Sequence, residues 1–209
     1  MAKLYFRYGA MNSGKSTGLL QTAYNYEERG QRVLLIKAVV DTKGEDSVVS
    51  RLGVSRRVDL LVDADDDLRA LVRRRALAGA QPVCEAGGAQ REAVSLREVL
   101  DCVLIDEAQF LDDHLPEVVE ALADQGIRVI IAGLDLDFRR KPFGPMADLC
   151  AIADSVDKLH AICMECGHWA NYSYRLVLGE QQVMLGEATE YSPLCRTCYL
   201  KHLNTTTEK

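Results

Sequence analysis

The chain has 209 residues, of which 48% are hydrophobic and 27% charged, close to the average for a soluble globular protein. This composition excludes disorder, collagen-like repeats and coiled coils, and no apolar run reaches the roughly 18 residues that span a bilayer. The formal charge of −6 argues against a broad nucleic-acid-binding face. Residues 1–5 lack the features of a secretory signal, so we expect a cytoplasmic protein that binds neither membranes nor nucleic acid.

Short apolar runs alternate with longer helix-like segments through most of the chain, which predicts an α/β fold with a parallel sheet and helices on both faces. From Cys163 onward, short alternating segments predict a small β-rich lobe. We therefore expect an α/β domain at 1–162, a lobe at 163–203 and a frayed tail at 204–209. The predicted elements are, in chain order, strand 3–8, helix 16–29, strand 33–36, loop 41–53, helix 64–79 with an acidic start, irregular stretch 79–91, strand 102–106, helix 116–125, strand 129–133, helix 146–154 and strand 156–162.

A phosphate-binding motif lies between the first predicted strand and helix. Residues 9–16, GAMNSGKS, fit the pattern G-x-x-x-x-G-K-[ST]. Small residues let backbone N–H groups converge on phosphate oxygens, and the helix N-terminus adds positive potential. Lys15 is expected to reach the phosphates of ATP and Ser16 to ligate Mg²⁺, whereas the alternative is a chance glycine-rich turn. The predicted ATP-binding residues here are Gly9, Ala10, Met11, Asn12, Ser13, Gly14, Lys15, Ser16 and Thr17.

Two adjacent acids follow the apolar run 102–105. Asp106 ends a predicted parallel strand, and ligands bind at this edge of a sheet, so we expect it to hold Mg²⁺ together with Ser16. Glu107 can accept a proton from a nucleophile. The alternatives for both acids are a helix cap or an unremarkable surface position. Ala108 and Gln109 complete the predicted ATP-binding set.

Seven cysteines in a chain without an export signal do not predict disulfides. Four of them form two C-x-x-C pairs, Cys163 with Cys166 and Cys195 with Cys198. Four thiolates fill a tetrahedral Zn²⁺ site and leave no open position, which predicts a structural zinc. A dithiol redox pair is the alternative and needs only one of these motifs. The lobe carries both signs of charge and no basic stripe, which weakens a nucleic-acid-binding role.

Several motifs together resemble the zinc-containing, cellular-type thymidine kinase family. They are the phosphate motif with Met11 at its third position, the segments 105–110 and 133–144, the two cysteine pairs and the segment 191–196. The resemblance covers almost the whole chain and is least secure at 79–91. It implies ATP- and Mg²⁺-dependent phosphorylation of the 5′-hydroxyl of thymidine, and of deoxyuridine, in nucleotide salvage. It also implies a homotetramer.

The resemblance also implies roles for individual residues. Glu107 would be the general base that takes the 5′-hydroxyl proton, and Asp41 the loop acid near the phosphates and metal. Tyr191 would lie against the base on a loop that the zinc lobe holds over the substrate, and Ser173 stands where the family commonly has threonine. The implied nucleoside-binding residues are Met11, Phe110, Leu134, Phe138, Phe143, Ser173 and Tyr191.

The chain departs from the family pattern at four positions, Ala10, Asn12, Lys43 and Thr189, none of which is Lys15, Ser16, Asp106 or Glu107. Two further functions stay open from the residues alone. One is a P-loop ATPase that acts on nucleic acid and grips it with a zinc ribbon, against which the negative charge argues. The other is a regulatory nucleotide-binding module without turnover, against which Glu107 argues.

Overall fold

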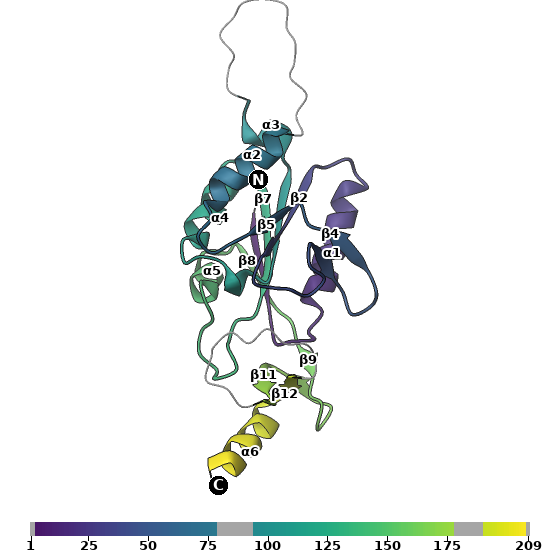
Figure 1. Cartoon of the computed structure of the whole chain (residues 1–209), viewed down its shortest axis with the longest axis vertical. Helices are drawn as coiled ribbons and strands as arrows, with labels where there is room; N and C mark the ends of the chain where they lie inside the picture. Colours follow the sequence, from purple (N-terminus) through teal and green to yellow (C-terminus); the bar gives the residue numbers. More distant parts are fainter. Residues whose placement is uncertain (1–2, 79–93, 178–189, 208–209) are drawn as a thin grey trace, which may run out of the picture.

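The computed structural model in Figure 1 describes residues 3–78, 94–177 and 190–207. Its centre is a six-stranded sheet of order β5-β2-β6-β7-β1-β8 in which every pairing is parallel. The strands are β1 (Leu4–Tyr8), β2 (Val33–Ala38), β5 (Leu60–Val62), β6 (Cys102–Asp106), β7 (Arg128–Gly133) and β8 (Ser155–Lys158). The apolar runs of β2, β6 and β7 are buried on both faces, as strands in the middle of a parallel sheet are. The predicted parallel sheet is confirmed.

Helices cover both faces of this sheet, as predicted (Figure 1). Helix α1 (Lys15–Glu27) packs Leu19 and Leu20 against one face, beside Leu35 and Leu104. Adjacent residues of the same strands, such as Ile36 and Ile105, point into the core on the other face. That face is covered by α2 (Leu68–Ala78), α3 (Leu96–Val99), α4 (Leu115–Asp124) and α5 (Met146–Ile152).

The segments 161–177 and 190–207 form a small unit that we call the cysteine lobe. It lies beyond the carboxyl ends of the strands, at the lower end of Figure 1. Its apolar core contains Ala170, Leu194 and Tyr199. The lobe consists of the antiparallel pair β9 (Ala161–Ile162) and β10 (Trp169–Ala170), the antiparallel pair β11 (Tyr172–Arg175) and β12 (Tyr191–Leu194), and helix α6 (Arg196–Thr207).

Two predictions for the first half of the chain are wrong. The predicted loop 41–53 contains β3 (Ser47–Val49), which pairs with β4 (Ser55–Arg57) because Val48 is buried against the α1 side of the sheet. The predicted helix 64–79 begins only at Leu68. The carboxylate of Asp67 accepts the N–H of Ala70 at 3.0 Å, so the acidic run precedes and caps the helix and does not form its first turn.

Two predictions near the carboxyl end also need correction. The predicted strand 156–162 divides, because the chain leaves the sheet after the N–H of Leu159 bonds to the carbonyl of Tyr8, and β9 then pairs with β10. Helix α6 continues to Thr207 where a frayed tail was predicted, since a helix that has begun adds residues at little cost.

The predicted irregular stretch 79–91 lies outside the described residues. Within the described part of the chain, no helix combines the length and the apolar character needed to cross a membrane.

Candidate active site

The phosphate motif forms the turn between β1 and α1. Gly9 touches the rest of the protein so closely that a Cβ at this position would lie 2.1 Å from the carbonyl oxygen of Leu159. The side chain of Lys15 is buried, and its ammonium donates to the carbonyls of Gly9 at 2.9 Å and Ala10 at 3.0 Å. Burial lowers the pKa of Lys15, which the carboxylates of Glu107 and Asp106 oppose. The turn therefore holds a cation among backbone groups, which suits an anionic ligand.

Three further residues of the motif have features of their own. Asn12 has a left-handed backbone conformation with φ 68°, and the Ser13 hydroxyl lies 3.4 Å from the Lys15 nitrogen. The Thr17 hydroxyl shares a hydrogen bond of 2.6 Å with that of Ser50.

Asp106 lies at the carboxyl end of β6 and is buried. Burial raises the pKa of Asp106, and a hydrogen bond from Ser16 and the charge of Lys15 oppose this change. Its Oδ1 atom is buried without a hydrogen-bond partner among the described residues. A buried oxygen of this kind is costly unless it has a ligand, and oxygen donors are the ones that Mg²⁺ prefers. The pair Ser16 and Asp106 thus fits a magnesium ion. Because Asp106 is buried, the alternative interpretation that it is a surface acid is excluded.

Glu107 has a left-handed backbone with φ 51° and begins the short 3-10 helix η1 (Ala108–Phe110). A conformation of this kind costs on the order of 1–3 kcal/mol in a residue other than glycine, and such strain is typical of functional positions. The Oε2 atom of Glu107 accepts a hydrogen bond of 2.6 Å from the side-chain amide of Gln109. The half-buried carboxylate is therefore held in one orientation beside Lys15 and Asp106.

Gln109 is a positioning residue that the sequence prediction had assigned only to ATP binding. Its Oε1 accepts the backbone N–H of Leu134 at 2.9 Å, and because that group can only donate, the amide NH₂ must face Glu107. Gly133 leaves room for this contact, since a Cβ there would lie 2.6 Å from Oε1. Leu134, directly after β7, thus orients the side chain of Gln109, which in turn orients the carboxylate of Glu107 after β6.

Aromatic side chains gather beside Gln109. Phe110 and Phe143 form an edge-to-face pair with ring centroids 5.5 Å apart. Phe143 is buried, Phe110 is half-buried, and Leu134 directly follows β7. The structure therefore brings these three predicted nucleoside-binding residues to one place, next to Glu107.

The remaining predicted nucleoside-binding residues meet where the cysteine lobe contacts the α/β domain. The hydroxyl of Ser173 accepts the backbone N–H of Met11 at 3.0 Å, so β11 bonds directly to the phosphate turn. The Tyr199 hydroxyl donates to the carbonyl of Phe138. These two hydrogen bonds join the cysteine lobe to the phosphate turn at Met11 and to the segment after β7 at Phe138.

Arg175 is a residue of this site that the sequence prediction missed. Its guanidinium lies 3.6 Å from the centre of the Phe138 ring and donates to the Tyr191 hydroxyl from Nη2 at 2.7 Å and Nε at 3.1 Å. Arg175 is buried and comes two residues after Ser173 in β11. Because side chains alternate along a strand, the placement of Ser173 at the site could have indicated that Arg175 faces the same way.

The four paired cysteines come together, as predicted. The sulfur atoms of Cys163, Cys166, Cys195 and Cys198 all lie within 4.8 Å of one another. Tetrahedral Zn²⁺ with bonds of about 2.3 Å places its sulfur ligands about 3.8 Å apart, and Cys166 and Cys195 are separated by 3.6 Å. The donor set fits a structural zinc ion. A dithiol redox centre does not explain why both pairs converge.

Asp41 and Lys43 lie in the connection between β2 and β3. The Asp41 carboxylate pairs with the ammonium of Lys37 at 3.1 Å and accepts the backbone N–H of Lys43, also at 3.1 Å. Thr189 lies outside the described residues.

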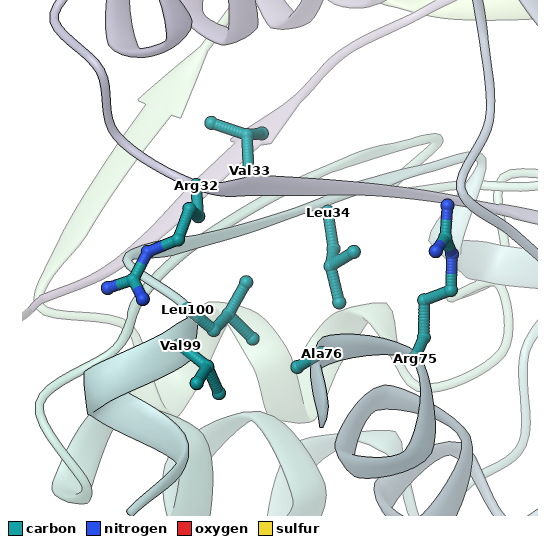
Figure 2. Close-up of a pocket in the computed structure, with 7 residues that line it drawn as sticks. All are labelled: Arg32, Val33, Leu34, Arg75, Ala76, Val99 and Leu100. Carbon is teal, nitrogen blue, oxygen red and sulfur yellow. The ribbon is translucent and has the colours of Figure 1, made fainter. Parts of the chain in front are cut away.

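Two cavities lie away from this site. One of about 190 Å³ opens at the amino end of β2, opposite the edge that carries Asp106 (Figure 2). It is lined by Arg32, Val33, Leu34, Arg75, Ala76, Val99 and Leu100. The other, of about 400 Å³, lies between the first turns of α2 and α4 and is bordered by Asp63, Asp65, Asp66, Asp67 and Asp112. The first cavity lies at the opposite edge of the sheet from Asp106, and the acids around the second would repel phosphate groups, so neither cavity extends the site.

The thymidine kinase family model matches residues 2–76 and 88–199. A thymidine kinase of Porphyromonas gingivalis is 47% identical over 92% of this chain and 82% of its own length. Those of Bacteroides thetaiotaomicron and Ruegeria pomeroyi are 42% and 38% identical, over 92% and 94% of this chain and 84% and 92% of theirs. With a phosphate turn, two strand-end acids and a four-cysteine cluster in one molecule, the chain belongs to the thymidine kinase family.

Proposed function

We propose that the chain transfers the γ-phosphoryl group of ATP to the 5′-hydroxyl of thymidine, and of deoxyuridine, in nucleotide salvage. Membership of the thymidine kinase family supports a phosphotransferase of this kind. The observation that carries the proposal is the convergence of Lys15, Asp106 and Glu107 beside the aromatic pair Phe110 and Phe143. An ATPase that acts on nucleic acid is not favoured. The relatives of this chain are thymidine kinases, and its formal charge of −6 does not suit a nucleic-acid ligand.

The donor phosphates would lie in the turn 9–14, where backbone N–H groups and the start of α1 favour anions. Lys15 would exchange its bonds to the turn carbonyls for bonds to phosphate oxygens. Ser16 and Asp106 would hold Mg²⁺, and Ala108 and Gln109 would border the nucleotide. A bound Mg²⁺ ion neutralises charge on the phosphoryl group during its transfer.

Glu107 would accept the proton of the 5′-hydroxyl as that oxygen forms its bond to the γ-phosphorus. The bond from phosphorus to the bridging oxygen breaks, and ADP leaves with the electron pair. Gln109 keeps the accepting carboxylate aimed at the nucleophile through its bond to Oε2. Since phosphoryl transfer depends mainly on positioning and on charge, this orientation supports the rate.

The thymine ring would lie among Phe110, Phe143 and Leu134 on one side and Phe138 and Tyr191 on the other. Flat aromatic faces suit a pyrimidine. Met11 and Ser173 would lie near the ring edge, where their mutual hydrogen bond joins the two halves of the pocket. A structural zinc ion bound by the four cysteines would fix the lobe that carries Tyr191, which excludes water during transfer.

The homotetramer, the cytoplasmic location and the division into 1–162, 163–203 and 204–209 belong to the same proposal. The family resemblance supports the homotetramer, a role in nucleotide salvage supports the location, and the position of the cysteine lobe beyond the sheet supports the division.

A coupled assay of ADP release tests the function. We expect ADP release with ATP, Mg²⁺ and thymidine, much less with deoxycytidine, and none that depends on single-stranded DNA. A Lys15→Met variant, which removes the phosphate-facing cation, serves as the matched inactive control. Release stimulated only by DNA would support the nucleic-acid ATPase, and ATP binding without release under any condition would support the regulatory module.

A further inference from the structure

Lys37 is a fully buried cation that the proposed chemistry does not use. It lies near the end of β2, directly opposite Asp106 in the neighbouring strand, and its side chain is 1% exposed. A buried ammonium is costly unless oxygen atoms surround it. The partners of Lys37 therefore show what it stabilises.

All the oxygen partners of Lys37 come from one short turn. The ammonium lies 3.1 Å from Oδ2 of Asp41 and donates to the carbonyls of Glu45 and Ser47, each at 3.3 Å, and to that of Lys43. These residues belong to the turn 41–47, which joins β2 to β3. A single buried cation thus binds the turn from its first residue to its last.

The backbone of this turn is bent to present those oxygens. Gly44 has φ 76° and Glu45 has φ 51°, and a Cβ on Gly44 would lie 2.4 Å from a methyl group of Val49. A left-handed conformation at Glu45 persists only where the surroundings enforce it. The four bonds to Lys37 supply that enforcement.

The turn 41–47 leads directly to the phosphate motif. Val48, one residue beyond it, packs in the same apolar cluster as Leu19 and Leu20 of α1. The hydroxyl of Ser50 bonds to that of Thr17. The charge of Lys43 also acts on Lys15 and lowers the pKa of that ammonium. The segment directly after the turn is therefore bonded to the phosphate motif, and the turn itself carries Lys43 close enough for its charge to act on Lys15.

We propose that Lys37, with Asp41 as its counter-ion, is a positioning residue that holds the turn 41–47 against the phosphate motif and so sets the affinity for ATP. Asp41 acts as the partner of a buried lysine and not as a metal ligand. The inference rests on ATP as the proposed phosphate donor and adds a determinant of donor affinity outside the motif.

The test measures ATP binding to the full chain by isothermal titration calorimetry, with Mg²⁺ and without any nucleoside. Lys37→Met and Asp41→Asn are each expected to weaken ATP binding by about 10- to 100-fold, because a small displacement of a bordering segment is enough for such a loss. Thymidine binding, measured separately, should stay within about twofold, since among the described residues no hydrogen bond or ion pair joins the turn to the aromatic pair Phe110 and Phe143 or to the cysteine lobe. Lys37→Arg keeps the charge and should recover part of the loss.

A matched control separates positioning from loss of stability. Ile36 is the preceding residue, fully buried on the opposite face of the sheet. Ile36→Ala should lower the melting temperature but leave ATP affinity unchanged at a temperature where all variants are folded. Wild-type ATP affinity in Lys37→Met and Asp41→Asn, or an equal loss in Ile36→Ala, would overturn the proposal. If Lys37→Met does not fold, Asp41→Asn decides alone.

The same data distinguish this proposal from the proposed function. A wild-type chain that binds ATP but does not phosphorylate thymidine would refute the function. The dependence of ATP affinity on Lys37 would still be measured.

Discussion

The phosphate side and the nucleoside side of the candidate site are built in different ways. The phosphate side uses two short runs of sequence, 9–17 and 106–109. They lie at the carboxyl ends of β1 and β6, the two strands that flank β7 in the parallel sheet. The nucleoside side draws on residues as far apart as Phe110 and Tyr191. The first depends on backbone geometry that the sheet enforces, whereas the second depends on how the cysteine lobe contacts the α/β domain.

This difference implies that the two sides can fail separately. The lobe is joined to the domain by the bond of Ser173 to Met11 and by the contacts of Arg175 and Tyr199 with Phe138. A change in the lobe should therefore weaken nucleoside binding and leave ATP binding intact. A change at Glu107, directly after β6, should affect the rate and leave nucleoside affinity intact.

The largest expected effect is on the phosphate side. Glu107→Gln should lower kcat by about 10²- to 10⁴-fold, because the proton acceptor is lost while the shape is kept. ATP affinity, measured by calorimetry, should be nearly unchanged. Glu117→Gln, which alters an exposed acid on α4, should leave kcat as in the wild type. An unchanged kcat in Glu107→Gln would refute the general-base role.

The next effect tests the nucleoside side through its metal. Cys195→Ser should release zinc, as measured by mass spectrometry of the metal content. If about 1% of the molecules then keep a docked lobe, the apparent Kd for thymidine rises about 100-fold. The Kd for ATP should change little, because the phosphate turn is fixed between β1 and α1 and by the bonds of Lys15 to Gly9 and Ala10.

Cys150→Ser is the matched control, since Cys150 lies on α5 outside the cluster and should leave both zinc and thymidine binding unchanged. Full zinc content with normal thymidine affinity in Cys195→Ser would show that nucleoside binding does not depend on a zinc-bound cysteine lobe.

A smaller effect is expected at Arg175. Arg175→Met removes two hydrogen bonds to Tyr191 and the contact with Phe138, and should raise the KM for thymidine about 10-fold with little change in kcat. Arg175→Lys keeps the charge but not the planar fork, so its KM should lie between the two. Arg128→Met removes a cation from the ring of Tyr26 and should change neither constant. A fall in kcat alone would argue against positioning of the nucleoside.

The smallest effect is expected at Gln109, which connects the two sides. Gln109→Leu removes the amide that orients Glu107 and should lower kcat about 5-fold, as the loss of one net hydrogen bond would. The KM for thymidine should also rise, because the N–H of Leu134 loses its acceptor beside the pocket. Gln125→Leu, at the exposed end of α4, should change neither constant. A change in kcat alone would show that Gln109 acts only on Glu107, and a change in KM alone would show that it acts only on the nucleoside side.

The parts of the molecule that sequence could predict are the local ones. The phosphate motif, Asp106 at the end of an apolar strand and the cysteine pairs carry their chemistry in short spacings, and the structure brings each group together. The nucleoside-pocket residues came from the family resemblance. Neither source indicated Arg175 or Lys37. Alternation along β11 could have placed Arg175 beside Ser173, but its contacts with Phe138 and Tyr191 are tertiary. The fold of the turn 41–47 over Lys37 is likewise not predicted by its polar sequence.

The errors in the elements have the same cause. The strand β3 lies in a polar segment whose pairing depends on burial of Val48 against a helix that comes earlier in the chain. The start of α2 depends on whether Asp67 caps the helix or belongs to it, which composition alone does not decide. Local pattern thus predicted every strand of the sheet except β5, and tertiary contacts set the ends of its connections.

The contact between Gly9 and Leu159 has a consequence for engineering. Leu159 lies where the chain passes from β8 into the cysteine lobe, and its carbonyl leaves no space for even a methyl group at position 9. Libraries that aim at new nucleoside preferences should therefore keep glycine at position 9. Variation of Ser173, Arg175 and Tyr191 would change the residues proposed to bind the nucleoside. The contact between Gly9 and Leu159 would still hold the phosphate turn against the segment that leads into the cysteine lobe.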